Sequence, residues 1–289
     1  MSGPWAGVVR ILGAVLAVAL ALALGACSGD PGDEDPRGTT TSSTPQGDPT
    51  TEGTETTSSP SQPRPRRGEC RALGWAAALA PTSHQRTVPC ARRHTAETYF
   101  VGRLDLHDDE GHRLGIDAPS VQAQPRRACT RRLAPHLGVA PDRLRLSMAQ
   151  AVWFTPSVED SHAGADWFRC DVVVVERDER LLPLPRRTAR SGAREDFGMC
   201  ATAEPGTAGF RRVACSAPHT WRALTTVDLP GRTLPTDARA AELMESPCRT
   251  AARSEADDPL DFRWSEERPT REQWAAGRRY GICWVPTGA

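Results

Sequence analysis

Two stretches of this 289-residue chain share one skeleton: PSVEDSHAGADWFRC at residues 156–170 and PTREQWAAGRRYGIC at residues 269–283. Both fit the pattern Pro-[Ser/Thr]-x5-Ala-Gly-x-x-[Trp/Tyr]-x-x-Cys without a gap. Proline and an Ala-Gly pair are typical of turns, an aromatic residue is typical of packing, and cysteine can cross-link. We therefore expect the skeleton to close a folded domain, once in each of two copies.

Other motifs precede both stretches in the same order. They are Gly-x-Cys (68–70 and 198–200), Val-x-Cys-x3-His-Thr (88–95 and 213–220) and a helix-like segment with a cysteine near its middle (123–138 and 237–256). Four cysteines that recur with the same neighbours indicate a tandem duplication. The sequence predicts a first domain at 68–185 and a second at 186–289, with a Pro-, Arg- and Gly-rich linker, LLPLPRRTARSGARED, around the boundary.

Each copy is predicted to be an α+β unit, a small antiparallel sheet with one main helix that carries the third cysteine. Strands are expected around the first cysteine, into the second cysteine and after the histidine. Before the skeleton, alternating apolar residues predict strands at 143–154 (RLRLSMAQAVWF) and 260–264 (LDFRW). The last strands are expected at 167–175 and 280–285, around the fourth cysteine.

The cysteine count points to disulfides. Eight cysteines follow Cys27, and an even number in an exported chain indicates an oxidised framework. If each copy pairs internally, three patterns per copy remain open. We favour first with second and third with fourth, because one pair would then clip neighbouring strands and the other would pin the helix to the last strand. The favoured pairs are Cys70–Cys90, Cys129–Cys170, Cys200–Cys215 and Cys248–Cys283.

The N-terminus is predicted to be a lipoprotein signal peptide, residues 1–26. Arg10 precedes a fourteen-residue apolar run at 11–24, which suits a signal-peptide core. The run ends in Leu-Gly-Ala-Cys, a lipobox, so Cys27 is expected to carry the lipid that anchors the chain to the outer face of a membrane. Ordinary secretion with cleavage nearby is the alternative.

Residues 27–67 are predicted to be a disordered tether. They are nearly all Ser, Thr, Pro, Gly and charged or amide residues, and residues 28–67 carry no apolar side chain larger than proline. Such a segment cannot bury enough surface to offset its ordering entropy. Its Ser/Thr/Pro content is also compatible with O-glycosylation.

The motif order resembles the septum formation-related domain of actinobacterial envelope proteins. The matching features are the Gly-x-Cys start, the Val-x-Cys-x-x-Pro-His element, the helix cysteine and the Gly-x-x-aromatic-x-x-Cys close. The resemblance implies an extracytoplasmic module linked to septation and envelope work, with no known enzymatic activity and no established ligand. The copies differ at Arg93 against Pro218 and at Glu97 against Arg222, which argues against a ligand role that both share.

Composition excludes several functions. Basic and acidic residues balance at 36 each, so the chain lacks the charge of a nucleic-acid binder. The chain has no C-x-x-C, Gly-x-Ser-x-Gly, P-loop or dinucleotide fingerprint, and no lysine. We expect no catalytic residue, no cofactor and no metal. Paired carboxylates occur at 108–110 and 159–160, but neither pair recurs in the other copy.

Some side chains remain candidates for binding. His94 and His219 follow a cysteine by four residues; a structural hydrogen bond to the turn is favoured over zinc, because the thiols are expected to be oxidised. The segment 107–112 (HDDEGH) is favoured as a solvated loop over a metal chelate. Trp167 and Tyr280 share one position in the skeleton, favoured as core aromatics that pack over the helix cysteine, with an exposed platform as the alternative.

Taken together, the sequence predicts a lipid-anchored, non-catalytic extracytoplasmic module that binds a division or envelope protein or a cell-wall glycan. A solute- or glycan-binding lipoprotein with its site between the two domains is the second hypothesis, and a hydrolase that uses carboxylates is the third. A solute binder predicts an apolar cleft with convergent polar groups, and a hydrolase predicts a carboxyl of raised pKa in a cleft.

Overall fold

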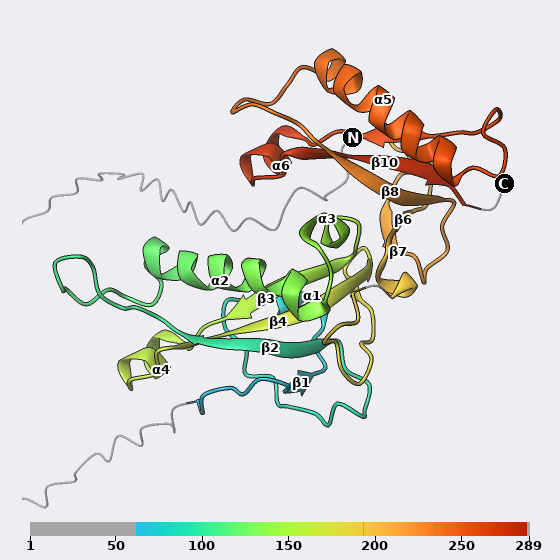
Figure 1. Cartoon of the computed structure of the whole chain (residues 1–289). Coiled ribbons are helices and arrows are strands. Elements are labelled where there is room, and N and C mark those ends of the chain that lie inside the picture. Colours follow the sequence, from blue (N-terminus) through green and yellow to red (C-terminus); the bar gives the residue numbers. More distant parts are fainter. Residues whose placement is uncertain (1–61, 193, 288–289) are drawn as a thin grey trace, which may run out of the picture. The chain divides into compact units, whose positions relative to one another are not determined.

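The computed structural model describes residues 62–192 and 194–287. They form two five-stranded antiparallel sheets, each accompanied by one long helix (Figure 1). This is the mixed α+β architecture that the sequence predicts. The expected signal peptide, the lipobox with Cys27 and nearly all of the expected tether lie outside the described residues.

The first sheet is built around one buried strand. Its strands are β1 (Cys70–Arg71), β2 (Ala96–Arg103), β3 (Ala149–Phe154), β4 (Trp167–Arg177) and β5 (Arg180–Leu181). Their order is β1-β2-β4-β3, and β5 pairs with β4. The helices of this half are α1 (Trp75–Leu79), α2 (Pro119–Leu137), α3 (Pro141–Leu144) and α4 (Val158–His162). The first nine residues of β4 are all buried, as its run of valines requires.

The second sheet repeats this order of elements. Its strands are β6 (Met199–Ala201), β7 (Arg212–Ala214), β8 (Trp221–Asp228), β9 (Ser265–Glu267) and β10 (Tyr280–Pro286), in the order β7-β6-β8-β10-β9. A 3₁₀ turn (Glu195–Phe197) precedes it, and its helices are α5 (Asp237–Glu255) and α6 (Arg271–Ala275). Four of its strands, in the order β6-β8-β10-β9, therefore correspond to β1-β2-β4-β3 of the first sheet, and β7 adds a further edge strand.

Four disulfides join the elements, with the pairing favoured from the sequence. They are Cys70–Cys90, Cys129–Cys170, Cys200–Cys215 and Cys248–Cys283. The second and fourth tie α2 to β4 and α5 to β10, and their cysteines are at most 1% exposed. In each half, one buried cross-link therefore fixes the long helix on its sheet.

The shared skeleton forms the same local structure twice. Its Ser157 and Thr270 cap the one-turn helices α4 and α6 by accepting a hydrogen bond from a backbone N–H in the first turn. Its glycines, Gly164 and Gly277, have φ of 98° and 96°, a region that L side chains avoid. The skeleton thus turns the chain and aims it into the last strand of each sheet.

The strands expected before the skeleton are partly wrong. Pro141 begins the short helix α3, since proline suits the first helical position, and β3 starts only at Ala149. In the second half, the backbone N–H of Leu260 donates to the Asp258 carboxylate in a turn, and Leu260 is 95% exposed. The strand β9 begins after the LDFRW segment, at Ser265. The alternating pattern in these two segments therefore belongs to a short helix in the first half and to a loop in the second.

The strand expected to lead into Cys90 is reduced to a single bridge between Cys70 and Val88. Proline has no N–H for a ladder, and Pro89 comes directly after the bridge. The corresponding segment of the second half has alanine there and forms β7. One residue difference thus shortens the edge of the first sheet.

Backbone hydrogen bonds link the two halves. The N–H of Met148 donates to Phe197 O (2.8 Å) and the N–H of Met199 donates to Leu146 O (2.8 Å). The segment that connects the halves lies on the first one, where Leu184 N donates to His94 O (2.9 Å). Apolar residues of both sheets belong to one hydrophobic cluster.

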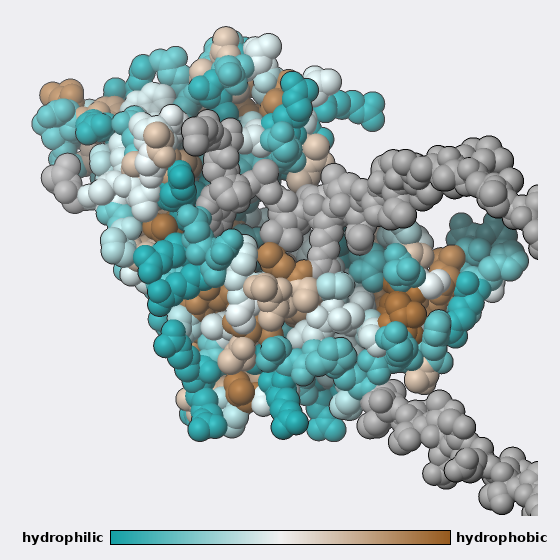
Figure 2. Space-filling model, turned by 180° about the vertical axis from the view of Figure 1, so that it is seen from behind, coloured by the Kyte–Doolittle hydropathy of each residue, from teal (hydrophilic) through white to brown (hydrophobic). Residues whose placement is uncertain are grey.

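The surface in the view of Figure 2 is mostly hydrophilic, with small hydrophobic areas between. Among residues 62–192 and 194–287, large hydrophobic side chains are exposed only at Val158 and Leu260. In that same part of the chain, neither long helix is apolar enough to cross a bilayer.

Candidate functional site

A cavity of about 780 Å³ lies beside the Cys70–Cys90 disulfide. Its polar lining consists of Arg67, Glu97, His136, Arg186 and Arg187, and Cys90 contributes to its wall. These residues come from the start of the first half, from β2, from α2 and from the connecting segment. Its size falls within the range of small-molecule and polymer subsites.

The cavity carries an excess of positive charge. Arg67, Arg186 and Arg187 are exposed, and within the described residues none of them forms an ion pair. Burial lowers the pKa of His136; the negative charge of Glu97 partly offsets this and the positive charge of Arg67 adds to it, so the imidazole is neutral at pH 7. Three guanidinium groups therefore face one carboxylate, that of Glu97. Free guanidiniums bind carboxylate and phosphate groups through paired hydrogen bonds.

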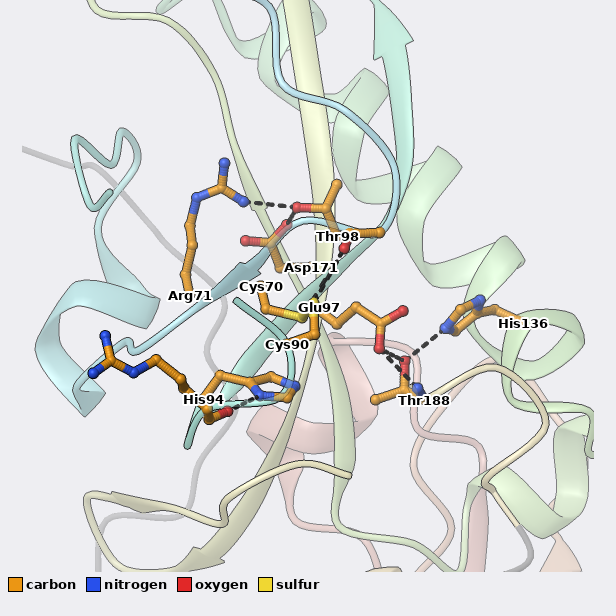
Figure 3. Close-up of a disulfide and its surroundings, with 11 residues drawn as sticks. Cys70, Arg71, Cys90, His94, Glu97, Thr98, His136, Asp171 and Thr188 are labelled. Carbon is orange, nitrogen blue, oxygen red and sulfur yellow. Dashed lines mark hydrogen bonds between the residues drawn. A yellow bond between two sulfur atoms is a disulfide. The ribbon is translucent and has the colours of Figure 1, made fainter. Parts of the chain in front are cut away.

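The floor of the cavity is a chain of three hydrogen-bonded side chains (Figure 3). Glu97 Oε2 accepts from the Thr188 backbone N–H (2.7 Å) and from the Thr188 hydroxyl (2.9 Å). Since that hydroxyl donates to Glu97, it accepts from Nε2–H of His136 (2.8 Å). Thr188 is 0% exposed. The chain fixes the connecting segment, and with it Arg186 and Arg187, against β2 and α2.

Tyr99 supports His136 from behind. The two rings stack with centroids 5.2 Å apart, and the Tyr99 hydroxyl donates to Cys129 O (2.7 Å). Burial raises the pKa of Tyr99 strongly, so the phenol stays neutral and keeps its role as a donor. The position of His136 is thus fixed by a stack on one side and by Thr188 on the other.

The two candidate histidines make the same turn contact. His94 Nδ1 lies 2.8 Å from Arg92 O, and His219 Nδ1 lies 2.7 Å from Ala217 O. His94 is 1% exposed and its Nε2 has no partner among the described residues, whereas His219 is half-exposed. Both contacts are those of a structural histidine, but only the first histidine has a buried nitrogen left over.

A second polar cluster lies on the opposite face of the first sheet. Arg71 Nη1 donates to Thr98 Oγ1 (2.9 Å), whose hydroxyl donates to Asp171 Oδ1 (2.7 Å), and Arg169 Nε donates to Asp171 Oδ2 (3.1 Å). All four side chains are at most 4% exposed. The corresponding residues of the second half are apolar: Ala201, Ala223, Trp284 and Ile282. The two halves therefore differ in the chemistry of this face.

The acidic candidates are surface features. In the loop 107–112, half-buried Asp108 accepts from the backbone N–H groups of Glu110 and His112, which are both exposed. Asp160 accepts from the backbone of Gln62, and hydrogen bonds at the start of α4 lower the pKa of Glu159. A lowered pKa does not suit a general acid.

The carboxyl of Glu266 has a raised pKa, caused mainly by burial, as a general acid would need. It lies on β9 of the second sheet and does not line the cavity.

The twin aromatics diverge. Trp167 is 2% exposed, and the half-buried ring of Tyr280 lies 4.3 Å from the Arg145 guanidinium and 5.3 Å from that of Arg278. Each aromatic stands three positions before its strand cysteine, so the two side chains point to opposite faces of the sheet. Trp167 is therefore a buried core aromatic, as expected, on the face of the sheet away from the helix cysteine.

Sequence reasoning missed most of the cavity. Thr188, His136 and the three arginines were not singled out, although the connecting segment was noted for its arginines. The Arg-Arg pairs at 66–67 and 186–187 were the available signal, because each flanks a predicted domain boundary.

Comparison with protein families gives a match to the one described as Septum formation, over residues 67–283. The matched span runs from the first cavity arginine to the last cysteine and thus contains all four disulfides, the whole first sheet and the second sheet up to Cys283 in β10. Neither the curated proteins nor the solved structures contain a match.

Proposed function

We propose, from the premise that this chain belongs to the septum formation family, that it is a non-catalytic, extracytoplasmic module that binds an anionic component of the cell wall. The observation that carries the proposal is the cavity lined by Arg67, Arg186 and Arg187. Arginine side chains without ion-pair partners suit phosphate or carboxylate groups on a wall polymer.

The disulfides support an extracytoplasmic location, since such bonds persist in oxidising compartments. A lipid on Cys27 and a flexible tether at 27–67 would hold the module on the membrane within reach of the wall. The order that four strands of each sheet share, β1-β2-β4-β3 and β6-β8-β10-β9, supports an origin by tandem duplication.

The two halves would then have different roles. The arginine cavity belongs to the first half and the connecting segment, and no residue of the second sheet lines it. The position of Glu97 is taken in the second half by Arg222, which pairs with Glu255 (2.7 Å) on α5. We infer that the second half supports the first and binds no second copy of the same ligand.

The test is cosedimentation of the full chain, in detergent, with purified wall sacculi. One sample of sacculi keeps its phosphodiester polymers and a second has been stripped of them. Phosphatidylglycerol in mixed micelles with the same detergent, added as a competitor, forms a third arm, because a lipid headgroup offers the same phosphate chemistry. Binding to intact sacculi that weakens steeply with added salt is expected. Equal binding to intact and stripped sacculi would assign the site to peptidoglycan carboxylates. Loss of sacculus binding to the phosphatidylglycerol micelles would overturn the wall assignment.

The decisive variant is the double substitution Arg186→Gln/Arg187→Gln. Its matched control is Arg126→Gln/Arg127→Gln, an exposed arginine pair on α2 that loses the same charge away from the cavity. Only the cavity variant is expected to lose sacculus binding. Equal losses in both variants would mean that net charge alone drives the association. No binding in any arm, together with recovery of one envelope protein from detergent extracts, would favour a protein partner instead.

A further inference from the structure

We propose that Cys70, Cys90, His94 and Glu97 form a zinc site when the Cys70–Cys90 disulfide is reduced. A sulfur of Cys70, a ring nitrogen of His94 and a carboxylate oxygen of Glu97 all lie within 4.8 Å of one another, and all three residues are buried. Cys90 is bonded to Cys70 and so brings a fourth donor to the same point (Figure 3). Two thiolates, one imidazole and one carboxylate are ligands that tetrahedral zinc accepts.

The histidine is already arranged as a metal ligand. Its Nδ1 contacts Arg92 O at 2.8 Å, so Nδ1 carries the proton and Nε2 presents a lone pair. That Nε2 is buried without a partner, which is rare for a polar atom in a folded protein. A ring nitrogen that is fixed by a backbone carbonyl, with the other nitrogen free, is the usual arrangement of a zinc-binding histidine.

The carboxylate is oriented as well. Both hydrogen bonds from Thr188 go to Oε2 of Glu97, which leaves Oε1 available. Zinc donors in a tetrahedral site lie roughly 3.5 Å apart, given bonds of about 2.0–2.3 Å. The distances between the donor atoms, which are at most 4.8 Å, therefore have to shorten by about 1 Å, and side-chain rotation can supply that change.

Access to the site follows from the cavity. Cys90 is half-exposed and lines the cavity wall, and Glu97 lines it too, while Cys70 is 0% exposed. A reductant of the dithiol class can therefore attack Cys90 Sγ. The reductant is oxidised to a disulfide, and the two electrons and two protons convert the Cys70–Cys90 bond to two thiols. Zinc then displaces both thiol protons to solvent and binds two thiolates.

The second half supplies a natural comparison. Cys200, Cys215 and His219 occupy the corresponding positions, with His219 bonded to its turn in the same way. Residue 222 is arginine there, and its guanidinium is committed to Glu255. This half has the two sulfurs and the imidazole without the carboxylate, so a weaker site or none is expected.

The experiment uses the full chain in detergent, reduced with a phosphine under nitrogen and freed of the reductant. Zinc affinity is measured by competition with a chelating dye, and Co²⁺ is added separately for its visible spectrum. Two variants are compared: Cys200→Ser/Cys215→Ser, which keeps the proposed site, and Cys70→Ser/Cys90→Ser, which keeps the site of the second half. The first is expected to bind one equivalent of metal with the intense d–d bands of tetrahedral cobalt and a thiolate charge-transfer band. The second is expected to show neither.

Equal metal binding by both variants would overturn the proposal, because it would indicate thiols of an unfolded chain. The proposal would also be overturned if Glu97→Gln or His94→Ala, added to Cys200→Ser/Cys215→Ser, left the cobalt spectrum unchanged. Thr188→Val keeps all four ligands and loses one hydrogen bond to Glu97, so it should weaken zinc binding by about 10- to 100-fold. Arg186→Gln/Arg187→Gln should leave zinc binding unchanged, which separates this proposal from the proposed wall binding.

Discussion

The carboxylate of Glu97 accepts two hydrogen bonds from Thr188, a residue 91 positions further along the chain, at 2.7 and 2.9 Å. This contact joins β2 of the first half to the segment that leads into the second. The same segment carries Arg186 and Arg187. The geometry of the proposed anion site therefore depends on a buried contact between Glu97 and Thr188, which the sequence around either residue does not reveal.

Replacement of Thr188 by valine should destabilise the chain. The substitution keeps the shape but leaves the N–H of His136 and one bond to Glu97 unsatisfied in a buried position, which costs roughly 1–3 kcal/mol. Thr130→Val is the control, because its exposed hydroxyl bonds only to Arg126 O one turn earlier, and a change within about 0.5 kcal/mol is expected. Urea unfolding followed by tryptophan fluorescence measures both. Equal losses would mean that the Thr188 hydroxyl has no special role.

The stability of the chain should fall at mildly acidic pH because of His136. Burial holds the pKa of this imidazole below its unfolded value of about 6.5, so the unfolded chain takes up the proton first. The stability is therefore complete above about pH 6.5 and is lost as the pH falls through the folded pKa. Urea unfolding between about pH 5 and 7.5 should show this slope in the wild type. A slope that survives in His136→Gln would assign the effect to another group.

The disulfide between helix and strand and the disulfide between neighbouring strands should differ in their contribution to stability. The Cys129–Cys170 bond closes a loop of 41 residues and the Cys200–Cys215 bond one of 15. In the chain-entropy model these loops are worth about 4 and about 3 kcal/mol. When each cysteine pair is replaced by alanine, the loss of stability should be larger for Cys129–Cys170 than for Cys200–Cys215. The buried Cys129–Cys170 pair should lose additional stability because its packing is lost. Thermal unfolding of the two double variants measures the difference, and the reverse order would contradict the model.

The repeated skeleton makes a paired prediction about glycine. Gly164→Ala and Gly277→Ala should each cost about 1–2 kcal/mol, because both residues have positive φ and nothing lies within 4 Å of an added Cβ. Asparagine at the same positions should cost less, since it tolerates this backbone region. Chemical denaturation of the four variants checks this. A large loss at only one of the two sites would show that the turns are not equivalent.

The sequence predicted the fold of each half because the repeated cysteines and turns are local signals. The Cys129–Cys170 and Cys248–Cys283 bonds followed from a helix and a strand that each carried one cysteine. The strand boundaries before the skeleton could not be predicted, since Leu144 and Leu260 fit an alternating pattern without pairing in a sheet. Strand pairing depends on neighbours distant in the sequence, which a local pattern does not contain.

The candidate site was harder to predict for the same reason. His94 was visible in a motif and Glu97 as a difference from Arg222, but their neighbours Thr188 and His136 come from distant segments. The polar cluster around Asp171 left a weak signal: RCD at 169–171 stands where the second half has ICW at 282–284. Only the register of β2 and β4 shows that Thr98 and Asp171 lie side by side.

The cluster around Asp171 should respond to substitution as a unit. Burial lowers the pKa of Arg169, and the charge of Asp171 partly offsets this. Asp171→Leu alone leaves that guanidinium buried without its partner, which should cost about 3–5 kcal/mol. Arg169→Leu/Asp171→Leu removes both charges, as the second half does with isoleucine and tryptophan, and should recover much of the loss. A double-mutant cycle by urea unfolding measures the coupling. Simple additivity of the two single losses would show that the pair does not act together.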